Sequence, residues 1–242
     1  MRSSARITLT PAFLLHHMPW RDSSRILEFV TREHGRVSLF ARGVRSQRSE
    51  LKAVLQPFQR TLISWSGRGE AGNLAAAELD GPPGGLPPAR LMSGFYLNEL
   101  LLKLLARHDS HPVLFDRYQE ALAELRRGAP EARTLRIFEK RLLEHIGYGI
   151  DLGRDAVSGA PLDPEGHYHF RADRGPWLAV GESAATYRGA SLAALAAEDL
   201  DDPQCLRDAR RLLREALSAC LEGRNLRSRE VMAALRQREV KA

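Results

Sequence analysis

Cysteine is scarce in this chain. Only two of the 242 residues are cysteines, Cys205 and Cys220, and they lie 15 residues apart in a segment of helical periodicity. Because a helix rises about 1.5 Å per residue, the two side chains are expected roughly 22 Å apart, too far for a disulfide. A reducing compartment such as the cytoplasm fits a protein without disulfides.

Long apolar runs and catalytic motifs are also missing. No stretch approaches the roughly 20 apolar residues of a membrane helix, and the N-terminus lacks the apolar core of about 7–15 residues found in a secretory signal. The motifs G-x-S-x-G and H-E-x-x-H and the phosphate-binding loop do not occur. We therefore expect a cytoplasmic protein that is not an enzyme and has no catalytic residues.

Short apolar runs broken by turn residues fill the chain up to about Asp80, a pattern typical of a small all-β barrel. These runs cover residues 11–18, 24–31, 36–43, 61–67 and 72–79. The segment from Gly67 to Gly72 matches G-x-G-x-x-G. No long helix follows it, so the match predicts a glycine-rich hairpin turn and not a dinucleotide site.

Helical periodicity follows a segment that interrupts regular structure. The stretch "GPPGGLPPAR" holds four prolines and three glycines, and it predicts a boundary. Beyond it, apolar residues recur at helical spacing over residues 89–107, 111–128, 131–149, 202–223 and 226–237. We predict an α+β chain with a β-barrel domain over residues 1–80, a linker over 81–88, and a mainly helical domain over 89–242 that has an irregular hairpin insert at about 150–181.

Positive charge gathers in one window. Between His34 and Gly69 there are seven Lys or Arg and one acid, Glu50, whereas the rest of the chain balances 29 bases against 29 acids. The whole net charge of +6 therefore lies in this window, as expected for a surface that binds a polyanion. An ordinary solvated face is the alternative.

A strand over "RVSLFAR" would place Arg36, Phe40 and Arg42 on one face, because side chains alternate along a strand. Cations that follow phosphates, together with an aromatic ring for stacking, are typical of single-strand-binding barrels. The alternative is that Phe40 belongs to the core and that the arginines only solvate it. The predicted DNA-binding residues of the window are Arg36, Phe40, Arg42, Arg45, Arg48, Lys52, Arg60 and Arg68.

Two pairs of histidines have spacings that would allow them to share a metal ion. His108 and His111 are expected near helix ends, and His167 and His169 on one face of a hairpin. A zinc site needs three or four ligands, and no cysteine or acid stands at a suitable spacing from either pair. We therefore expect no metal and no cofactor.

Several segments, taken in order, resemble the bacterial recombination mediator family RecO. They are "HGRVSLFARGVRS", "LQPF", "FYLNELLLKLL", "HIGYG" and "LRSRE", and the similarity runs over nearly the full length. The resemblance implies an N-terminal OB-fold, a helical C-terminal domain, and a nucleoid protein of DNA repair, recombination and the DNA damage response. It also implies binding of single- and double-stranded DNA, strand annealing, the partners RecR and the acidic C-terminal tail of single-stranded DNA-binding protein, and loading of RecA on coated strands.

The resemblance has one departure. Many family members carry a zinc site with a C-x-x-C-G element just after the "GY" segment, whereas this chain has Asp155 and Ser158 where the cysteines would fall. The chain therefore resembles the zinc-free branch. Residues 150–181 are then expected to be held by packing and hydrogen bonds alone.

An acidic tail that ends in apolar residues requires cations beside an apolar groove, and the resemblance points to the helix in "RTLRIFEKRLLEHIGYG". The predicted tail-binding residues, with Arg136 as the central one, are Arg133, Arg136, Lys140, Arg141, Leu135 and Phe138. The alternative is that these are ordinary helix cations paired with Glu139 and Glu144. For the whole protein, the competing hypothesis is an adaptor that recruits acidic proteins through its basic barrel face and does not act on DNA.

Overall fold

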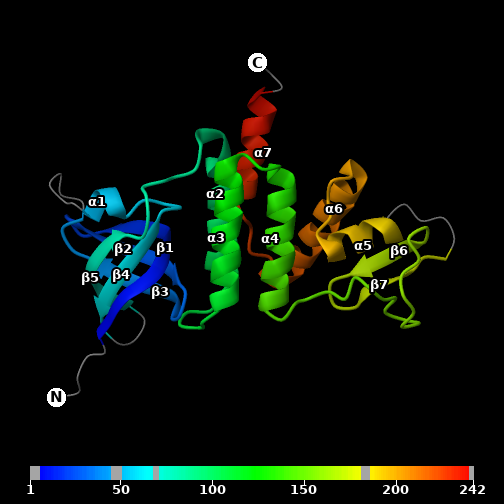
Figure 1. Ribbon diagram of the computed structural model, residues 1–242, viewed down its shortest axis with the longest axis horizontal. Coiled ribbons are helices and arrows are strands. Elements are labelled where there is room, and N and C mark those ends of the chain that lie inside the picture. Colours follow the sequence, from blue (N-terminus) through cyan, green and yellow to red (C-terminus); the bar gives the residue numbers. More distant parts are fainter. Residues whose placement is uncertain (1–5, 45–50, 68–70, 181–185, 240–242) are drawn as a thin grey trace. The chain divides into compact units, whose positions relative to one another are not determined.

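The computed structural model describes residues 6–44, 51–67, 71–180 and 186–239, with side chains up to residue 235 (Figure 1). Contacts divide the chain into two compact units. The first takes in the chain up to Arg127 and again from Leu226, and the second is Gly128–Asn225. The predicted α+β fold, an OB-type barrel followed by helices, is confirmed, whereas the domain boundaries at 80 and 88 stay a prediction.

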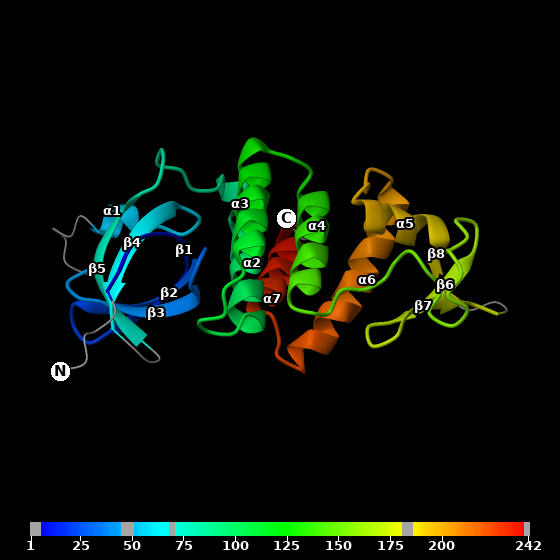
Figure 2. The ribbon, with the colours of Figure 1, turned by 60° about the horizontal axis from the view of Figure 1, so that its bottom comes forward.

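Five strands close into a barrel at the start of the first unit (Figure 2). They are β1 (Arg6–Trp20), β2 (Ser24–Thr31), β3 (Gly35–Ala41), β4 (Arg60–Ser66) and β5 (Ala71–Leu79), with the short helix α1 (Leu51–Val54) before β4. The order around the barrel is β1-β2-β3-β5-β4, and β3 and β5 form its parallel pair. This is the strand order of an OB-fold. β4 and β5 pair antiparallel, whereas residues 68–70 of the predicted hairpin turn lie outside the described residues.

Alternating apolar side chains fill the barrel, as the sequence pattern predicts. Val37, Leu39 and Ala41 of β3 each have at most 1% of their surface exposed, and they pack with Leu27 and Phe29 of β2. The same core receives Ala12, Leu14, Ile63 and Trp65 from β1 and β4. The strands form because one face of each can be buried in this way.

A helical hairpin packs on the outside of the barrel in the first unit. It consists of α2 (Leu91–Leu104) and α3 (Pro112–Arg127). The ring of Phe13 in β1 lies 5.3 Å from Phe115 and 5.1 Å from Tyr118, measured between ring centroids. The amide of Asn98 donates to the carbonyl of Leu15 at 3.0 Å. The barrel and the hairpin therefore share buried surface, and the outer side of β1 is partly core.

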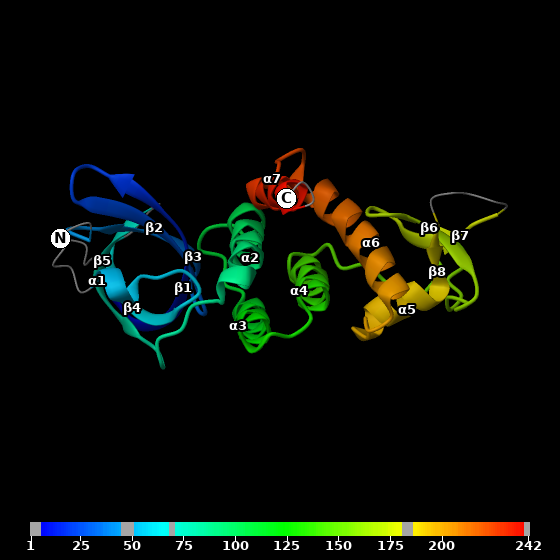
Figure 3. The same ribbon diagram turned by 90° about the horizontal axis from the view of Figure 1, so that it is seen from above.

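The last helix, α7 (Arg227–Glu239), packs against α2 in the same unit (Figure 3). The carboxylate of Glu99 in α2 accepts hydrogen bonds from the backbone amides of Arg227 and Ser228, both at 2.9 Å. These amides belong to the first turn of α7, which has no partner for them within the helix. A side chain from α2 thus supplies the cap and fixes where α7 begins.

The second unit combines helices with a small sheet. Its elements are α4 (Glu131–His145), β6 (His167–Arg171), β7 (Gly175–Leu178), β8 (Tyr187–Arg188), α5 (Gly189–Ala197) and α6 (Pro203–Leu221), and the sheet order is β7-β6-β8. Cys205 and Cys220 both lie in α6 and are free and buried, which confirms that they do not pair. Across the ranges that the structure describes, no helix is both long and apolar enough to cross a membrane.

Asp155 holds together the irregular part of the second unit. Its Oδ1 accepts from the amides of Val157 at 2.8 Å and Ser158 at 2.7 Å, and its Oδ2 accepts from the amide of Leu178 in β7 at 2.6 Å. The hydrogen bond from Ser158 lowers the pKa of Asp155, burial opposes this, and the other two amides help to bring the pKa to about 2. One carboxylate therefore ties a turn to a strand where the family resemblance places a zinc ligand.

Replacing Asp155 with asparagine is expected to lower the unfolding free energy by about 3 kcal/mol at pH 7, because an asparagine side chain has one neutral acceptor oxygen where the carboxylate binds three backbone amides with two charged ones. The pKa of Asp155 is lower in the folded protein than in the unfolded chain, where it is about 3.9. The carboxylate therefore contributes its full stabilisation of the fold above about pH 3.9, and this contribution disappears as the pH falls toward 2. Urea unfolding between pH 7 and pH 2 measures this.

The unfolding free energies of the wild type and of the Asp155→Asn variant should become similar near pH 2. Asp151→Asn is the control, since Asp151 accepts one exposed hydrogen bond, from the amide of Gly153 at 2.9 Å. A stability difference for Asp155→Asn that persisted unchanged at pH 2 would contradict the role given to the charge.

Candidate nucleic-acid interface

The outer surface of β3 carries the first part of the predicted DNA-binding site. Val37, Leu39 and Ala41 point into the barrel core. Because side chains alternate along a strand, Arg36 and Phe40 lie on the opposite, outer side. The predicted division of the strand into two faces is therefore confirmed, and Phe40 is not part of the barrel core.

Phe40 belongs to an exposed apolar patch. The register sets Met18 opposite Ile26, and Ile26 opposite Phe40, so these three side chains share one face of the sheet. The ring centroid of Trp20 lies 5.8 Å from that of Phe40, with the planes at 53°. Trp20 and Met18 are each 44% exposed. We call Met18, Trp20, Ile26 and Phe40 the aromatic face.

Met18, Trp20 and Ile26 of this face are not among the predicted residues, and Trp20 is the aromatic side chain that the sequence reasoning missed. The predicted strand ended at Met18, whereas β1 continues to Trp20, which pairs with Ser24 at the turn into β2. The signal was present in the sequence. His16, Met18 and Trp20 stand two residues apart, as side chains on one face of a strand do.

The cations of the first unit that are outside the barrel core differ in their relation to the aromatic face, and Arg42, two residues after Phe40, is the one placed next to it by the strand. Arg42 is exposed directly after β3, and Lys52 is exposed on α1. Arg25 of β2 is half-buried, and its pairing with Ala41 places it on the side of the sheet opposite to Ile26 and Phe40. Three other predicted DNA-binding residues, Arg45, Arg48 and Arg68, lie outside the described residues.

Arg36 is directed toward protein groups at the other end of β3. Its Nη1 donates to the carbonyl of Leu102 in the last turn of α2, and its Nε lies 4.0 Å from the Glu28 carboxylate. Only 16% of its side chain is exposed. Burial lowers the pKa of Arg36 from its ordinary value, Glu28 opposes this shift, and Arg107 adds to it. The structure therefore places Arg36 in the contact between barrel and helices.

Glu28 and Arg60 are further polar groups with partners inside the first unit. The buried carboxylate of Glu28 accepts from the Ser38 hydroxyl and, at 2.9 Å, from Nη2 of Arg107. Arg60 lies 2.7 Å from the Asp80 carboxylate and donates to Gln119 at 2.9 Å. Like Arg36, Arg60 thus has protein partners for its charge.

The predicted tail-binding residues lie on α4 of the second unit, and three of the six are buried. Leu135 and Phe138 belong to the core, with 8% and 1% of their surface exposed. Arg136 is 9% exposed and forms an ion pair with Glu139, which is 1% exposed. The residue predicted to be central to tail binding therefore sits beneath the surface beside a buried acid.

The remaining cations of α4 gather around Glu198, which follows α5. Arg141 binds the Glu198 carboxylate at 2.6 Å and Lys140 at 3.2 Å, while Arg133 donates to the backbone carbonyl of Glu198 at 3.1 Å. Burial raises the pKa of Glu198, but the hydrogen bonds from Arg141 and Lys140 outweigh it, so the pKa lies below its ordinary value. This cation cluster thus already binds one carboxylate.

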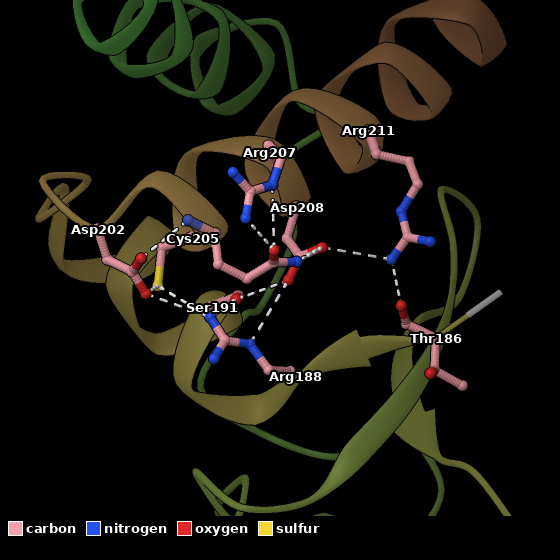
Figure 4. A network of polar contacts seen from close by, with 9 residues as sticks. Thr186, Arg188, Ser191, Asp202, Cys205, Arg207, Asp208 and Arg211 are labelled. Atoms are coloured by element: carbon pink, nitrogen blue, oxygen red, sulfur yellow. Dashed lines mark hydrogen bonds and ion pairs between the residues drawn. The ribbon is translucent and has the colours of Figure 1, made fainter. Parts of the chain in front are cut away.

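A network of polar contacts joins β8 and α5 to the start of α6 (Figure 4). Arg188 donates to the carboxylate of Asp202 at 3.2 Å, and the thiol of Cys205 donates to the same oxygen at 3.3 Å. The hydroxyl of Ser191 donates to the buried Asp208 at 2.7 Å. Burial raises the pKa of Cys205, which keeps the thiol protonated. These contacts are suited to holding the unit together.

The histidine pairs lie where the sequence analysis expects them. His108 and His111 are in the connection between α2 and α3, and His167 and His169 lie on one face of β6. In the described part of the chain, no three His, Cys, Asp or Glu side chains gather closely enough to hold a metal ion. That the protein needs neither metal nor cofactor stays a prediction.

The closed barrel of OB strand order, with ring side chains on its open outer face, defines an OB-barrel protein, a class whose strand face and loops receive oligonucleotides or oligosaccharides. The family model described as "Recombination protein O N terminal" matches residues 4–82, and "Recombination protein O C terminal" matches residues 88–230. The chain belongs to the RecO family, which confirms the resemblance.

Curated relatives agree with the family models over nearly the whole chain. DNA repair protein RecO of Ralstonia nicotianae is 41% identical over 98% of this chain and 88% of its own length. DNA repair protein RecO of Methylococcus capsulatus is 44% identical, over 94% of this chain and 93% of its own length. The relative of that name from Aromatoleum aromaticum is 41% identical, over 98% of this chain and 100% of its own length.

Proposed function

We propose that this chain binds single-stranded DNA across the aromatic face and anneals complementary strands, without catalytic residues, as a recombination mediator. The observation that carries the proposal is the contact of the exposed Trp20 with the half-buried Phe40 on the outer face of an OB-type barrel. Bases stack on such rings whatever their sequence. Arg42, two residues after Phe40, is exposed and can neutralise phosphates, which is what two strands need in order to approach each other. Lys52 is exposed on α1 and can add to the positive charge of the barrel surface.

From family membership we further propose that the protein helps load RecA on DNA coated by single-stranded DNA-binding protein, with RecR as a partner. The acidic C-terminal tail of the coating protein would bind the second unit. Lys140 and Arg141 support this, because they already hold the carboxylate of Glu198 and could exchange it for a carboxylate of the tail. The buried Arg136 is a support for this surface and not a contact.

Replacing Trp20 with alanine in the full chain tests the DNA proposal. Loss of one stacking platform is worth about 1–3 kcal/mol, so affinity for a single-stranded oligonucleotide should fall by about 5–150-fold. The salt dependence should stay the same, because no charge has changed. Fluorescence anisotropy with a labelled oligonucleotide at several salt concentrations measures both quantities.

Two further variants make the test specific. Tyr148→Ala removes an aromatic side chain that is 54% exposed in the second unit, and it should bind the oligonucleotide like the wild type. Arg42→Ala should lower the slope of log affinity against log salt by about 0.7, the value for one phosphate contact on a single strand. Unchanged binding by both Trp20→Ala and Arg42→Ala would overturn the proposal and favour the adaptor alternative.

A further inference from the structure

A cleft of about 570 Å³ opens at one end of the barrel in the first unit. Three segments meet there: the turn between β2 and β3, the neighbouring ends of β4 and β5, and the connection between α2 and α3. Its lining includes His34, Trp65, Gly72, Arg107 and His108. None of these residues belongs to the aromatic face.

The cleft exists because β3 changes partner along its length. From Ser38 to Phe40 it pairs with β5, whereas upstream the carbonyl of Arg36 accepts from the amide of His108 at 3.0 Å. A gap is therefore left between β5 and the connection between α2 and α3. Gly72 lines this gap, and any larger residue would be crowded there, because a Cβ atom would lie 3.0 Å from the side chain of Trp65 and 3.1 Å from that of Leu39.

The walls of the cleft combine flat rings with hydrogen-bonding groups. His34 lies edge-on to Trp65, with 5.3 Å between the ring centroids. Arg107, whose side chain is 39% exposed, is anchored by Glu28 at 2.9 Å. Glu33 also lines the cleft, and its carboxylate is suited to accept from an exocyclic amino group. A flat heterocycle with a polar edge and an attached phosphate matches this set of groups.

We infer that the cleft binds one unstacked nucleotide of the DNA strand, with its base against the half-buried ring of His34, which contacts the buried Trp65, and its phosphate at Arg107. This inference rests on the proposed function. The lining of the cleft includes Ser38, which lies two residues from Phe40 on the same side of β3, so this part of the cleft is about 7 Å from the aromatic face. Its volume lies within the range of about 300–1,000 Å³ that small-ligand sites have. A strand stacked on Trp20 could therefore place a neighbouring nucleotide in it.

Tryptophan fluorescence tests the inference directly, because the chain has three tryptophans and only Trp65 lines the cleft. In the variant Trp20→Phe/Trp177→Phe, Trp65 is the remaining reporter and the aromatic face keeps a ring. Titration with deoxyadenosine monophosphate should change its emission in a saturable way. Deoxyribose 5-phosphate, which lacks the base, should bind at least about tenfold more weakly, since stacking of a base is worth that much.

Variants of the cleft complete the experiment. In the same background, His34→Ala and Arg107→Ala should each weaken the response to deoxyadenosine monophosphate by about tenfold. Arg117→Ala, which removes an arginine of similar exposure from α3, should leave it unchanged. No saturable response of Trp65 overturns the inference. If Trp20→Ala still weakens oligonucleotide binding in that case, the proposed function stands; if it does not, both fail.

Discussion

Replacing Arg136 with methionine is expected to destabilise the second unit by about 3–5 kcal/mol, the range found when one partner of a buried ion pair is removed. Only 10% of the Arg136 side chain and 1% of that of Glu139 are exposed. The variant keeps the apolar volume but leaves the Glu139 charge without the guanidinium beside it. Chemical unfolding followed by circular dichroism measures the loss.

The double variant Arg136→Met/Glu139→Leu is the matched control. Replacing a whole buried pair by apolar groups is often neutral, so the double variant should recover most of the stability that the single variant loses. A single variant that unfolds at the same denaturant concentration as the wild type would contradict the buried-pair assignment.

This prediction also changes how the tail-binding proposal should be tested. A charge-reversing substitution at Arg136 would disrupt the fold and could not report on a partner. Arg141 is 24% exposed, and Glu198 keeps its contacts with Lys140 and Arg133 when Arg141 is removed, so Arg141→Ala should destabilise the unit less than Arg136→Met does. If the proposal is right, Arg141→Ala weakens binding of an acidic tail peptide while oligonucleotide binding stays at the wild-type level.

Replacing Gly35 with alanine is expected to destabilise the first unit by about 3–5 kcal/mol. Gly35 begins β3 with a φ of +63°, and a Cβ atom there would lie 2.0 Å from the backbone carbonyl oxygen of Asp109. Backbone cannot move aside as the end of a side chain can. The variant must therefore shift the connection between α2 and α3 away from β3.

Gly43 provides the control for Gly35. Its φ is +69°, but no atom lies within 4 Å of the position of its Cβ. Gly43→Ala therefore carries only the backbone cost of about 1–2 kcal/mol. Thermal unfolding of both variants separates the cost of the positive φ from the cost of the steric clash with Asp109. Equal losses of stability at the two positions would show that the clash with Asp109 is not the cause.

Much of the fold could be predicted because it depends on local pattern. The alternation in β3 settled which side chains face the core, since a strand has only two sides. The glycines and prolines after Asp80 marked the change from strands to helices. The helix α5 was not among the predicted helices, because "GASLAALAA" has alanines all round and no apolar stripe that contrasts with a polar face.

The candidate site was harder to predict because the sequence does not show which group a charged side chain will contact in the folded protein. Arg36 and Arg42 are both arginines of one window, yet Arg36 meets the Leu102 carbonyl, 66 residues away along the chain, while Arg42 is exposed. Likewise Arg141 meets Glu198, which is 57 residues away. Long-range pairing decides whether a cation is available to a ligand.

The sequence by itself determined the family, the order of barrel and helices, and the location of the net charge, because these depend on composition, periodicity and motif order. Only the tertiary structure decided which cations remain accessible, that Trp20 contacts Phe40, and that a cleft opens where β3 changes partner. The physical reason is that register and packing bring together groups distant in sequence, and burial determines which of them water, or a DNA strand, can reach.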